Sequence, residues 1–452
     1  MNIWLARSAY SLLLRLALPL YLARLWWRGR REPAYRQWWG ERLGFSRAPR
    51  APGRLWLHAV SLGETRAAAP LIDALRAARP GLRLLLTHGT ATGREAGLGL
   101  LREGDAQAWL PYDTPGAVRR FLQHHQPLAG VVMETEVWPN LLHQARAAGL
   151  PMILANARLS ERSARKGQRL SALQQPAMAS FTHVLAQTEV DATRLRAAGA
   201  PRVQVLGNLK FDMTPRAELL AMGQGWRQQL DRPVVLAAVT REGEEAPLLA
   251  AWAALPLPRP LLLLVPRHPQ RFDEVAGLVA QTGLRLSRRS QWPADGLLGE
   301  PAELAELAAQ AAQTAQAAQA AQTEQAEQAD VWLGDSLGEM PAYYAAADVA
   351  LLGGSFAPLG GQNLIEAAAC GCPLVMGPHT FNFAQAAELA LAAGAAVRVA
   401  DLGDAVKQAL RLIQSPQQLL MRQQALAFAA AHRGAATRMA RSVLEGVGRS
   451  AA

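Results

Sequence analysis

Residues 58–64, His-Ala-Val-Ser-Leu-Gly-Glu, decide how the first half of this chain is expected to fold. They follow the apolar run 55–57 and precede a helical pattern over residues 65–78. A buried strand that ends at a Ser/Gly turn and leads into a helix is typical of a doubly wound α/β domain, whose crevice lies at that edge of the sheet. Glu64 falls in the first helical turn, where a carboxylate either takes a proton from a substrate hydroxyl or caps the helix. Glu64 is therefore a candidate general base, with a capping acid as the alternative.

Apolar runs of strand length alternate with helical stretches along the rest of the chain. Continuous runs of Val, Leu, Ile and Ala predict parallel strands that are buried on both faces. They form two sets, residues 55–60, 82–88, 128–133, 151–156, 183–187 and 203–207, and residues 234–239, 261–265, 330–333, 348–353, 372–376 and 395–399. The pattern predicts two doubly wound, Rossmann-like domains that face each other across a cleft. We assign residues 32–207 to the first domain, 208–425 to the second and 426–452 to a C-terminal helical tail.

The N-terminal segment, residues 1–31, is basic and aromatic. Residues 1–50 contain ten arginines and two glutamates, so they account for +8 of the total formal charge of +11. A nucleic-acid-binding surface spread over the fold is therefore not expected. Arginines interrupt the apolar stretch 3–25, and Trp26-Trp27 suits a lipid headgroup layer, so a helix held at an anionic membrane surface fits this composition. The alternative is a helix packed on a neighbouring domain. If the helix binds the membrane, it either spans the bilayer or lies on its surface. Pro19 is expected to kink or divide the helix.

Polar side chains gather just past the predicted strands. Because the carboxyl ends of parallel strands meet at one edge of a sheet, this placement predicts a binding cleft and an enzyme rather than a scaffold. The residues are Glu64, Glu134, Glu136, Asn156, Arg158, Gln187, Glu189, Asn208, Lys210 and Asp212 in the first half, and Thr240, Arg241, Glu242, Arg267, His268 and Ser355 in the second.

Lys210 is a second candidate catalytic residue. The chain contains 44 arginines and three lysines, so a lysine in a loop that follows a strand is unusual for this composition. A compact ammonium group can offset negative charge that develops on a phosphate or a sugar. An ordinary surface salt bridge with Asp212 is the alternative.

The second domain carries the features of a nucleotide half-site. Residues 360–366, Gly-Gly-Gln-Asn-Leu-Ile-Glu, form a glycine turn into a helix, whose first N–H groups can bind a phosphate. Glu366 in that first turn could bridge two ribose hydroxyls. Gly338-Glu339 begins another predicted helix, and Arg267 is the expected cation for the phosphate.

Several other classes of site are not predicted. The chain has no P-loop, no complete dinucleotide fingerprint and no G-x-S-x-G elbow, and its nine histidines lack metal-ligand spacing. Its two cysteines, Cys370 and Cys372, form neither a zinc motif nor a disulfide framework, which fits a reducing compartment. Residues 301–328, composed mainly of Ala, Gln and Glu, are expected to be an insertion in a surface loop, either helical or disordered.

These motifs resemble the 3-deoxy-D-manno-octulosonic acid (Kdo) transferases of lipopolysaccharide synthesis over nearly the whole chain. The segments that carry the resemblance are residues 24–30, RLWWRGR; 39–45, WGERLGF; 58–64, HAVSLGE; 133–140, METEVWPN; 155–160, ANARLS; 207–212, GNLKFD; 265–272, VPRHPQRF; and 376–383, MGPHTFNF.

The resemblance implies a two-domain glycosyltransferase of the GT-B type that needs no metal or other cofactor. It implies CMP-Kdo as the donor and a tetraacylated lipid A precursor, lipid IVA, as the acceptor, at the cytoplasmic face of the inner membrane. By matching position it implies that Glu64 is the general base and that Glu134 and Lys210 support the transition state. It implies that CMP is held by Pro266, Arg267, Leu337, Gly338, Glu339, Asn363, Leu364, Ile365 and Glu366.

Three positions depart from the family's usual pattern. Gln362 and Arg241 stand where the family often has His, and Leu364 stands where it has Pro. A nucleotide-sugar epimerase on the same fold and a non-catalytic membrane protein that keeps the fold are the competing hypotheses.

Overall fold

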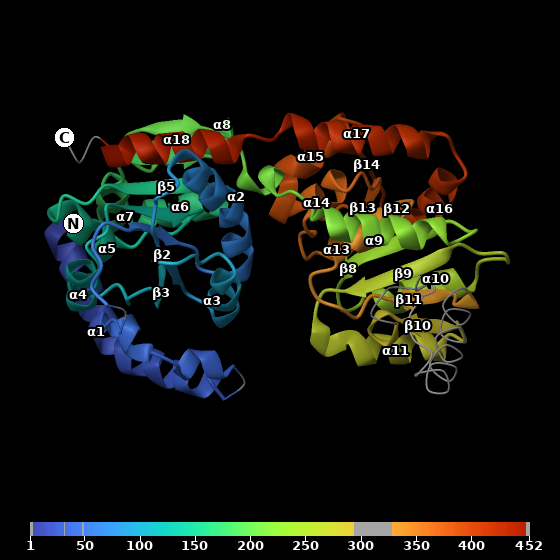
Figure 1. Ribbon diagram of the computed structural model, residues 1–452, viewed down its shortest axis with the longest axis horizontal. Coiled ribbons are helices and arrows are strands. Elements are labelled where there is room, and N and C mark those ends of the chain that lie inside the picture. The colour runs from blue at the N-terminus through green and yellow to red at the C-terminus, as the bar shows by residue number, and fades with distance from the viewer. Residues whose placement is uncertain (1–2, 31, 48, 293–327, 449–452) are drawn as a thin grey trace, which may run out of the picture. The chain divides into compact units, whose positions relative to one another are not determined.

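The computed structural model describes residues 3–30, 32–47, 49–292 and 328–448, and the chain divides into two compact units. Unit 1 comprises Met1–Met213 together with His432–Ala452, and unit 2 comprises Thr214–Ala431. Each unit is built on a seven-stranded sheet in which neighbouring strands are parallel, with helices on its faces (Figure 1). The predicted α/β class with two Rossmann-like domains is therefore confirmed.

The sheet of unit 1 has the strand order β3-β2-β1-β4-β5-β6-β7. Its winding reverses between β1 and β4, which puts the expected ligand crevice at the carboxyl ends of those two strands. The elements are β1 (Leu55–His58), α2 (Leu62–Ala78), β2 (Leu84–His88), α3 (Ala91–Leu98), β3 (Ala106–Trp109), α4 (Pro115–His125), β4 (Ala129–Met133), α5 (Pro139–Ala147), β5 (Met152–Ala157), α6 (Glu161–Arg169), α7 (Ser171–Met178), β6 (His183–Ala186), α8 (Glu189–Ala197), β7 (Val203–Val205), the 3-10 helix η3 (Leu209–Asp212) and α18 (Ala435–Gly448).

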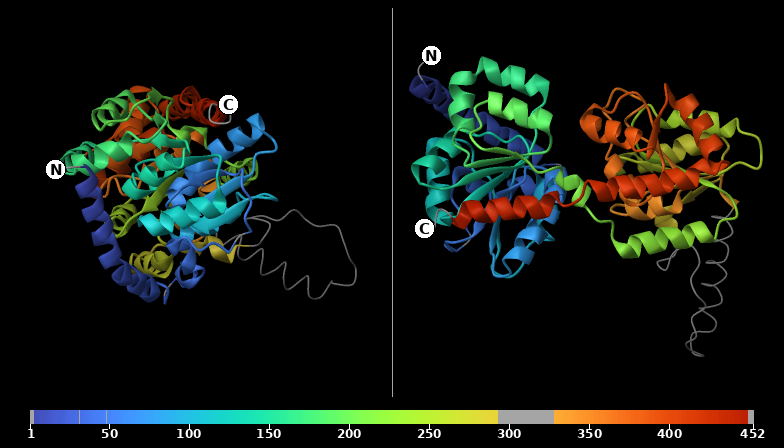
Figure 2. Two further views of the ribbon diagram at one scale, coloured as in Figure 1. Left: turned by 90° about the vertical axis from the view of Figure 1, so that its left-hand side faces the viewer. Right: turned by 90° about the horizontal axis from the view of Figure 1, so that it is seen from above.

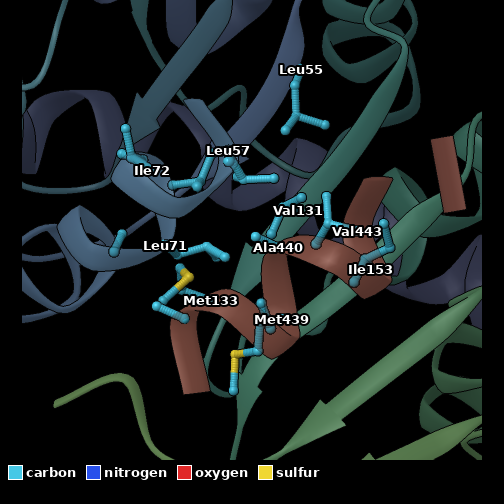
Figure 3. Close-up of a cluster of buried hydrophobic side chains, with 14 of the residues drawn as sticks. Leu55, Leu57, Leu71, Ile72, Val131, Met133, Ile153, Met439, Ala440 and Val443 are labelled. Carbon is cyan, nitrogen blue, oxygen red and sulfur yellow. The ribbon is translucent and has the colours of Figure 1, made fainter. Parts of the chain in front are cut away.

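The last helix of the chain, α18, completes the core of unit 1. Met439, Ala440 and Val443 pack with side chains of β1, β4 and α2, including Leu57 and Leu71 (Figure 3). Both carboxylate oxygens of Asp212 accept hydrogen bonds at the start of this helix, from the backbone N–H groups of Gly434 and Ala436. These contacts explain why residues 432–448 fold with the first half of the chain.

Helix α1 (Ile3–Arg28) lies along the outside of unit 1 and continues through Pro19 (Figure 2). It is long and apolar enough to cross a membrane by length and composition, and only 11% of its most apolar stretch is buried. One narrow side contacts unit 1: the Tyr10 hydroxyl donates to Asp113 Oδ2 at 3.0 Å, and the Ser11 hydroxyl donates to Asn140 Oδ1 at 3.0 Å. Pro19 does not divide the helix. Packing on the adjoining unit and an exposed apolar face occur together.

The sheet of unit 2 has the strand order β10-β11-β9-β8-β12-β13-β14, and its winding reverses between β8 and β12. Its elements are α9 (Ala217–Gln228), β8 (Val234–Thr240), α10 (Glu245–Ala253), β9 (Leu261–Pro266), α11 (Phe272–Gln281), β10 (Leu286–Arg288), β11 (Val331–Leu333), α13 (Met340–Ala346), β12 (Val349–Leu352), α14 (Leu364–Ala369), β13 (Leu374–Met376), α15 (Ala384–Ala392), β14 (Ala396–Arg398), α16 (Leu402–Ile413) and α17 (Gln417–Ala431).

The structure adds one strand to each predicted set. Strands β3 and β10 lie at sheet edges and carry the polar residues Gln107 and Ser287, so neither forms a continuous apolar run. The structure also begins unit 2 at Thr214, six residues after the predicted boundary, because η3 packs with α2 and α18. Of the predicted insertion 301–328, residues 301–327 lie outside the described residues.

Candidate functional site

Glu64 sits in the turn between β1 and α2. Ser61 is the N-cap of α2, and its hydroxyl accepts a hydrogen bond from the Glu64 N–H at 3.4 Å. The Glu64 carboxylate in turn accepts from the Val60 N–H at 2.8 Å and from the Ser61 hydroxyl at 3.4 Å. Ser61 is therefore the capping residue, and Glu64 folds back onto the turn that precedes the helix, with one of its oxygens engaged only by a long hydrogen bond.

Burial raises the pKa of Glu64 from its ordinary value of 4.5 to about 7. The Val60 N–H opposes this rise in pKa because it stabilises the carboxylate, whereas the nearby Glu134 and Glu136 carboxylates add to it. A carboxylate whose pKa lies near neutral pH is suited to general base catalysis, which a simple helix-capping acid does not require.

The backbone around Glu64 is held from the neighbouring strand and helix. The Val60 carbonyl accepts hydrogen bonds from the Gly89 N–H at 3.0 Å and from the Thr90 hydroxyl at 3.1 Å. A Cβ atom at Gly93 would lie 3.0 Å from the Ser61 carbonyl carbon, so glycine allows α3 to approach the turn closely. These contacts fix the position of Glu64 before any substrate binds.

Two buried histidines lie beneath the same turn. A ring nitrogen of His58 is 3.0 Å from the Thr87 carbonyl oxygen, and a ring nitrogen of His88 is 3.0 Å from the Ala59 carbonyl oxygen. Burial lowers the pKa of His58 to about 3 and that of His88 to about 4, so both rings are neutral at pH 7. They therefore serve as hydrogen-bonding supports for the strand end.

Glu134 and Lys210 come together at the same edge of the sheet. Lys210 Nζ lies 3.8 Å from Glu134 Oε1, and the two side chains are 19% and 16% exposed. Glu134 adopts a φ of +56°, an uncommon backbone conformation for a residue with a side chain, directly after β4. Since the Glu134 carboxylate also raises the pKa of Glu64, the three residues predicted as catalytic share one electrostatic environment within unit 1.

The loop that carries Lys210 is fixed to the strand ends beside it. Asn156, with a φ of +52° in β5, accepts a hydrogen bond from the Leu209 N–H at 3.0 Å through its side-chain oxygen. The Asn208 side chain accepts from the Lys210 N–H at 3.0 Å and donates to Gln187 at 3.1 Å. Asn156, Gln187 and Asn208 were singled out in the sequence as polar strand-end residues, and here they position the lysine.

Glu136 is a residue that the sequence did not assign to the catalytic set. Burial is the main cause of its raised pKa, and Glu134 adds to the effect. Its position two residues after Glu134 was visible in the sequence, but its burial was not.

In unit 2, the predicted nucleotide-binding residues lie at the carboxyl ends of β9, β11 and β12. Pro266 is buried and ends β9, and the exposed Arg267 follows it. The Arg267 N–H donates to the Thr240 carbonyl at 2.9 Å, which joins the ends of β8 and β9. Leu337 is 75% exposed, and Gly338 has a φ of +83°.

Glu339 and the start of α14 have partners within unit 2. The Glu339 carboxylate binds the Arg289 guanidinium through two hydrogen bonds of 3.0 Å. Asn363 caps α14 by accepting from the Ile365 N–H at 3.3 Å. Leu364 and Ile365 are buried, so any contact they make with a nucleotide is limited to the backbone. Glu366 is half-buried in the first turn.

A buried carboxylate that sequence reasoning missed, Glu244, joins the two loops at the winding reversal of unit 2. It accepts hydrogen bonds from the Arg241 N–H at 2.9 Å and from the Gly354 N–H at 2.8 Å. Val239 nearby has a φ of +60°, which is strained for a β-branched residue. A Cβ atom at Gly353 would lie 2.4 Å from the Val239 carbonyl oxygen. These contacts lie at the carboxyl ends of β8 and β12, where the winding reverses and where a doubly wound domain binds its ligand.

Within residues 3–30, 32–47, 49–292 and 328–448, no group of three or more His, Cys, Asp or Glu side chains is placed to hold a metal ion.

Two Rossmann-like units, each with polar residues at the carboxyl ends of its strands, are the architecture of an α/β enzyme of the GT-B type. A family model described as 3-deoxy-D-manno-octulosonic-acid transferase (kdotransferase) matches residues 37–213. This range ends at Met213, the last residue of the first segment of unit 1. The 3-deoxy-D-manno-octulosonic acid transferase of Bordetella pertussis is 47% identical over 96% of this chain and 98% of that protein. The enzyme of the same name from Haemophilus influenzae is 33% identical over 90% of each chain. The chain belongs to the Kdo transferase family and is therefore a glycosyltransferase.

The fold is also that of a solved glycosyltransferase structure. The structure from Rickettsia africae has a TM-score of 0.55 and 11% identity, and the match covers 88% of this chain and 99% of that one. At this level of identity the match supports the fold and no more.

Proposed function

We propose that this enzyme transfers Kdo from CMP-Kdo to the lipid A precursor, lipid IVA, in lipopolysaccharide synthesis, with inversion at the anomeric carbon. Membership of the Kdo transferase family supports the transferred sugar. The observation that carries the mechanism is the pKa of about 7 of Glu64, a carboxyl group at the winding reversal of unit 1.

In the proposed reaction, Glu64 takes the proton from the primary hydroxyl of the acceptor sugar. The hydroxyl oxygen forms a bond to the anomeric carbon of Kdo as the bond from that carbon to the CMP phosphate oxygen breaks, and CMP leaves with the bonding electrons. Attack from the face opposite CMP inverts the configuration without a covalent intermediate. The proton stays on Glu64 until it passes to solvent after the product leaves.

Glu134 and Lys210 are proposed to support the transition state. The ammonium group of Lys210, 3.8 Å from Glu134, can offset negative charge on the reacting sugar or its leaving group. The Glu134 carboxylate holds that ammonium in place and also raises the pKa of Glu64. Loss of either residue is therefore expected to affect the chemical step more than the binding of CMP.

CMP is proposed to bind at the carboxyl edge of unit 2. Arg267 supplies the cation for the phosphate, Pro266 lies beside it, and residues 337–339 and 363–366 form the rest of the pocket. Glu244 fixes the loops after β8 and β12 at the same edge of the sheet, through the Arg241 and Gly354 N–H groups. Since Leu364 and Ile365 are buried, their proposed contribution is through backbone groups.

The acceptor is proposed to reach the enzyme at the cytoplasmic face of the inner membrane. Helix α1 exposes a set of large apolar side chains, Ile3, Trp4, Leu5, Leu12, Leu13, Leu16, Leu20, Tyr21, Trp26 and Trp27. An amphipathic or apolar helix with tryptophans at both ends and arginines along it suits the headgroup region of an anionic bilayer. Attachment there would keep the enzyme where its lipid substrate resides.

The test is transfer in a purified system that contains CMP-Kdo and lipid IVA, with the product analysed by mass spectrometry. The proposal predicts addition of Kdo by the wild-type enzyme and no detectable addition by a Glu64→Gln variant whose melting temperature still rises with CMP. A larger rise with UDP than with CMP, together with epimerisation of a UDP-sugar, would favour the epimerase hypothesis. Absence of labelled Kdo from the lipid would favour the non-catalytic hypothesis.

A further inference from the structure

A cavity of about 550 Å³ lies where the first turns of α1 meet α5 and α7 in unit 1. These three helices pack against one another (Figure 1). Neither Glu64, Glu134 nor Lys210 lines this cavity, so it is separate from the proposed catalytic residues. Nothing in the proposed transfer reaction accounts for it.

The ionisable side chains that line the cavity are all basic: Arg7 of α1, and His143 and Arg146 of α5. In the part of the chain that the structure describes, no carboxylate forms an ion pair with Arg7 or Arg146. The more deeply buried Arg76, Arg94 and Arg271 are each paired with at least one carboxylate. The pKa of His143 is lowered by desolvation, and then by Arg7 and Arg146. Arg7 and Arg146 therefore concentrate positive potential in one space, next to an imidazole that their charge helps to keep neutral.

The rest of the lining is apolar or small. Ile3, Pro139, Leu173 and Pro176 contribute to it, with alanines between them. The exposed apolar side chains of α1, such as Trp4 and Leu5, continue from the same helical turns. A ligand that matches this surface carries an anionic group at one end and a hydrocarbon chain at the other.

Helix α6, which packs against α7, extends the positive surface. None of its residues is buried, and Arg162, Arg165, Lys166 and Arg169 line a surface pocket together with Glu161, which pairs with Arg165. Basic residues near a helix with exposed apolar side chains are typical of a protein surface that contacts an anionic bilayer.

We propose that the cavity binds the phosphate group of an acidic phospholipid, with Arg7 and Arg146 as the phosphate ligands and an acyl chain along the apolar face of α1. This site would give membrane attachment a preference for anionic lipid that the apolar helix alone cannot provide. The inference does not depend on which sugar the enzyme transfers.

The test compares two double variants with the same change in charge, Arg7→Gln/Arg146→Gln and the control Arg411→Gln/Arg441→Gln, whose arginines are exposed on α16 and α18. The probes are soluble short-chain phosphatidylglycerol and phosphatidylcholine, measured by titration calorimetry, and vesicles with or without phosphatidylglycerol, measured by co-sedimentation. We expect saturable binding of phosphatidylglycerol by the wild type and the control. We expect the cavity variant to lose this binding, and its partition into anionic vesicles to fall about 30-fold, since each basic residue near an anionic surface contributes roughly fivefold.

Three results would overturn the proposal. One is equal binding of the two short-chain lipids by the wild type. Another is equal loss of vesicle binding in both double variants, which would indicate a diffuse effect of net charge. The third is unchanged lipid binding by the cavity variant with a higher KM for the acceptor, which would make the cavity an acceptor subsite. An unchanged rise in melting temperature with CMP in each variant verifies that the protein remains folded.

Discussion

Replacing Glu64 with Gln is predicted to make the protein more stable at pH 8 while it abolishes transfer. Gln has nearly the shape of a protonated Glu and keeps an oxygen that can accept the Val60 hydrogen bond. It cannot ionise, so it avoids the cost of holding a carboxylate in the partly buried turn. The variant therefore removes the free-energy cost of the charged carboxylate and leaves the shape of the site nearly unchanged.

The magnitude follows from the difference in pKa between the folded and unfolded chain. The pKa of Glu64 rises from 4.5 to about 7 on folding. A difference of one between two pKa values corresponds to about 1.4 kcal/mol, so ionised Glu64 destabilises the fold by about 3 kcal/mol. Because the folded pKa is raised, Glu64 does not lower the free energy of unfolding below about pH 4.5. The wild type loses about 3 kcal/mol of that free energy as the pH rises from there through about 7. The Glu64→Gln variant lacks this loss.

The assay is thermal unfolding of the wild type and the Glu64→Gln variant at pH 5 and pH 8. For a unit of this size, 1 kcal/mol corresponds to about 2–4 °C, so the variant should melt about 6–12 °C higher than the wild type at pH 8. The difference should be much smaller at pH 5, where the folded wild type holds a protonated Glu64. Glu189→Gln is the matched control, since its side chain is 77% exposed in the first turn of α8, and a change within about 0.5 kcal/mol is expected.

Equal melting temperatures for the wild type and the Glu64→Gln variant at pH 8 would refute the reasoning, because they would mean that the Glu64 carboxylate is ionised in the folded protein without cost. A stabilisation of the same size at pH 5 and pH 8 would also refute it, because the effect would then not depend on ionisation.

Three further outcomes are expected. Lys210→Met should lower kcat about 100-fold with little change in the affinity for CMP, since charge at the reacting centre is lost while unit 2 is untouched; a similar kcat in titrations with labelled donor would contradict this role. Asp212→Ala should destabilise unit 1 by about 1 kcal/mol in urea unfolding because α18 loses its cap, and no change in stability would mean that the cap is dispensable. Glu244→Gln should weaken CMP binding about tenfold in calorimetry, because the amide replaces the second acceptor oxygen, which faces the Gly354 and Ala357 N–H groups, with a donor; unchanged affinity would separate this carboxylate from the nucleotide site.

The buried strands of both sheets could be predicted because parallel strands covered on both faces are continuous apolar runs. The edge strand Ala106–Trp109 escaped prediction since one side of it lacks a neighbour, and a polar Gln107 is tolerated there. The return of α18 to unit 1 could not be predicted either. It depends on the contact between Asp212 and the backbone of residues 434 and 436, which are more than two hundred positions away in the sequence.

The candidate site was predicted in part. Glu64 could be found because a strand, a Ser N-cap and an acidic residue follow one another in the sequence. Its raised pKa could not be found, since it arises from burial and from Glu134 and Glu136, which belong to another loop. The pairing of Lys210 with Glu134 is likewise a tertiary contact. Glu244 left no distinctive signal, because Arg241 to Glu245 reads as an ordinary charged loop.

The most direct test of the central claim is the pH dependence of kcat for Kdo transfer from CMP-Kdo to lipid IVA, measured for the wild type and the Glu64→Gln variant. With Glu64 as the base, the wild-type kcat should rise about tenfold per pH unit below pH 7 and level off above it, and the variant should be about 100-fold slower or more across the range. A Glu64→Gln variant with near wild-type kcat, or a wild-type kcat that does not change between pH 5.5 and 8.5, would contradict the claim.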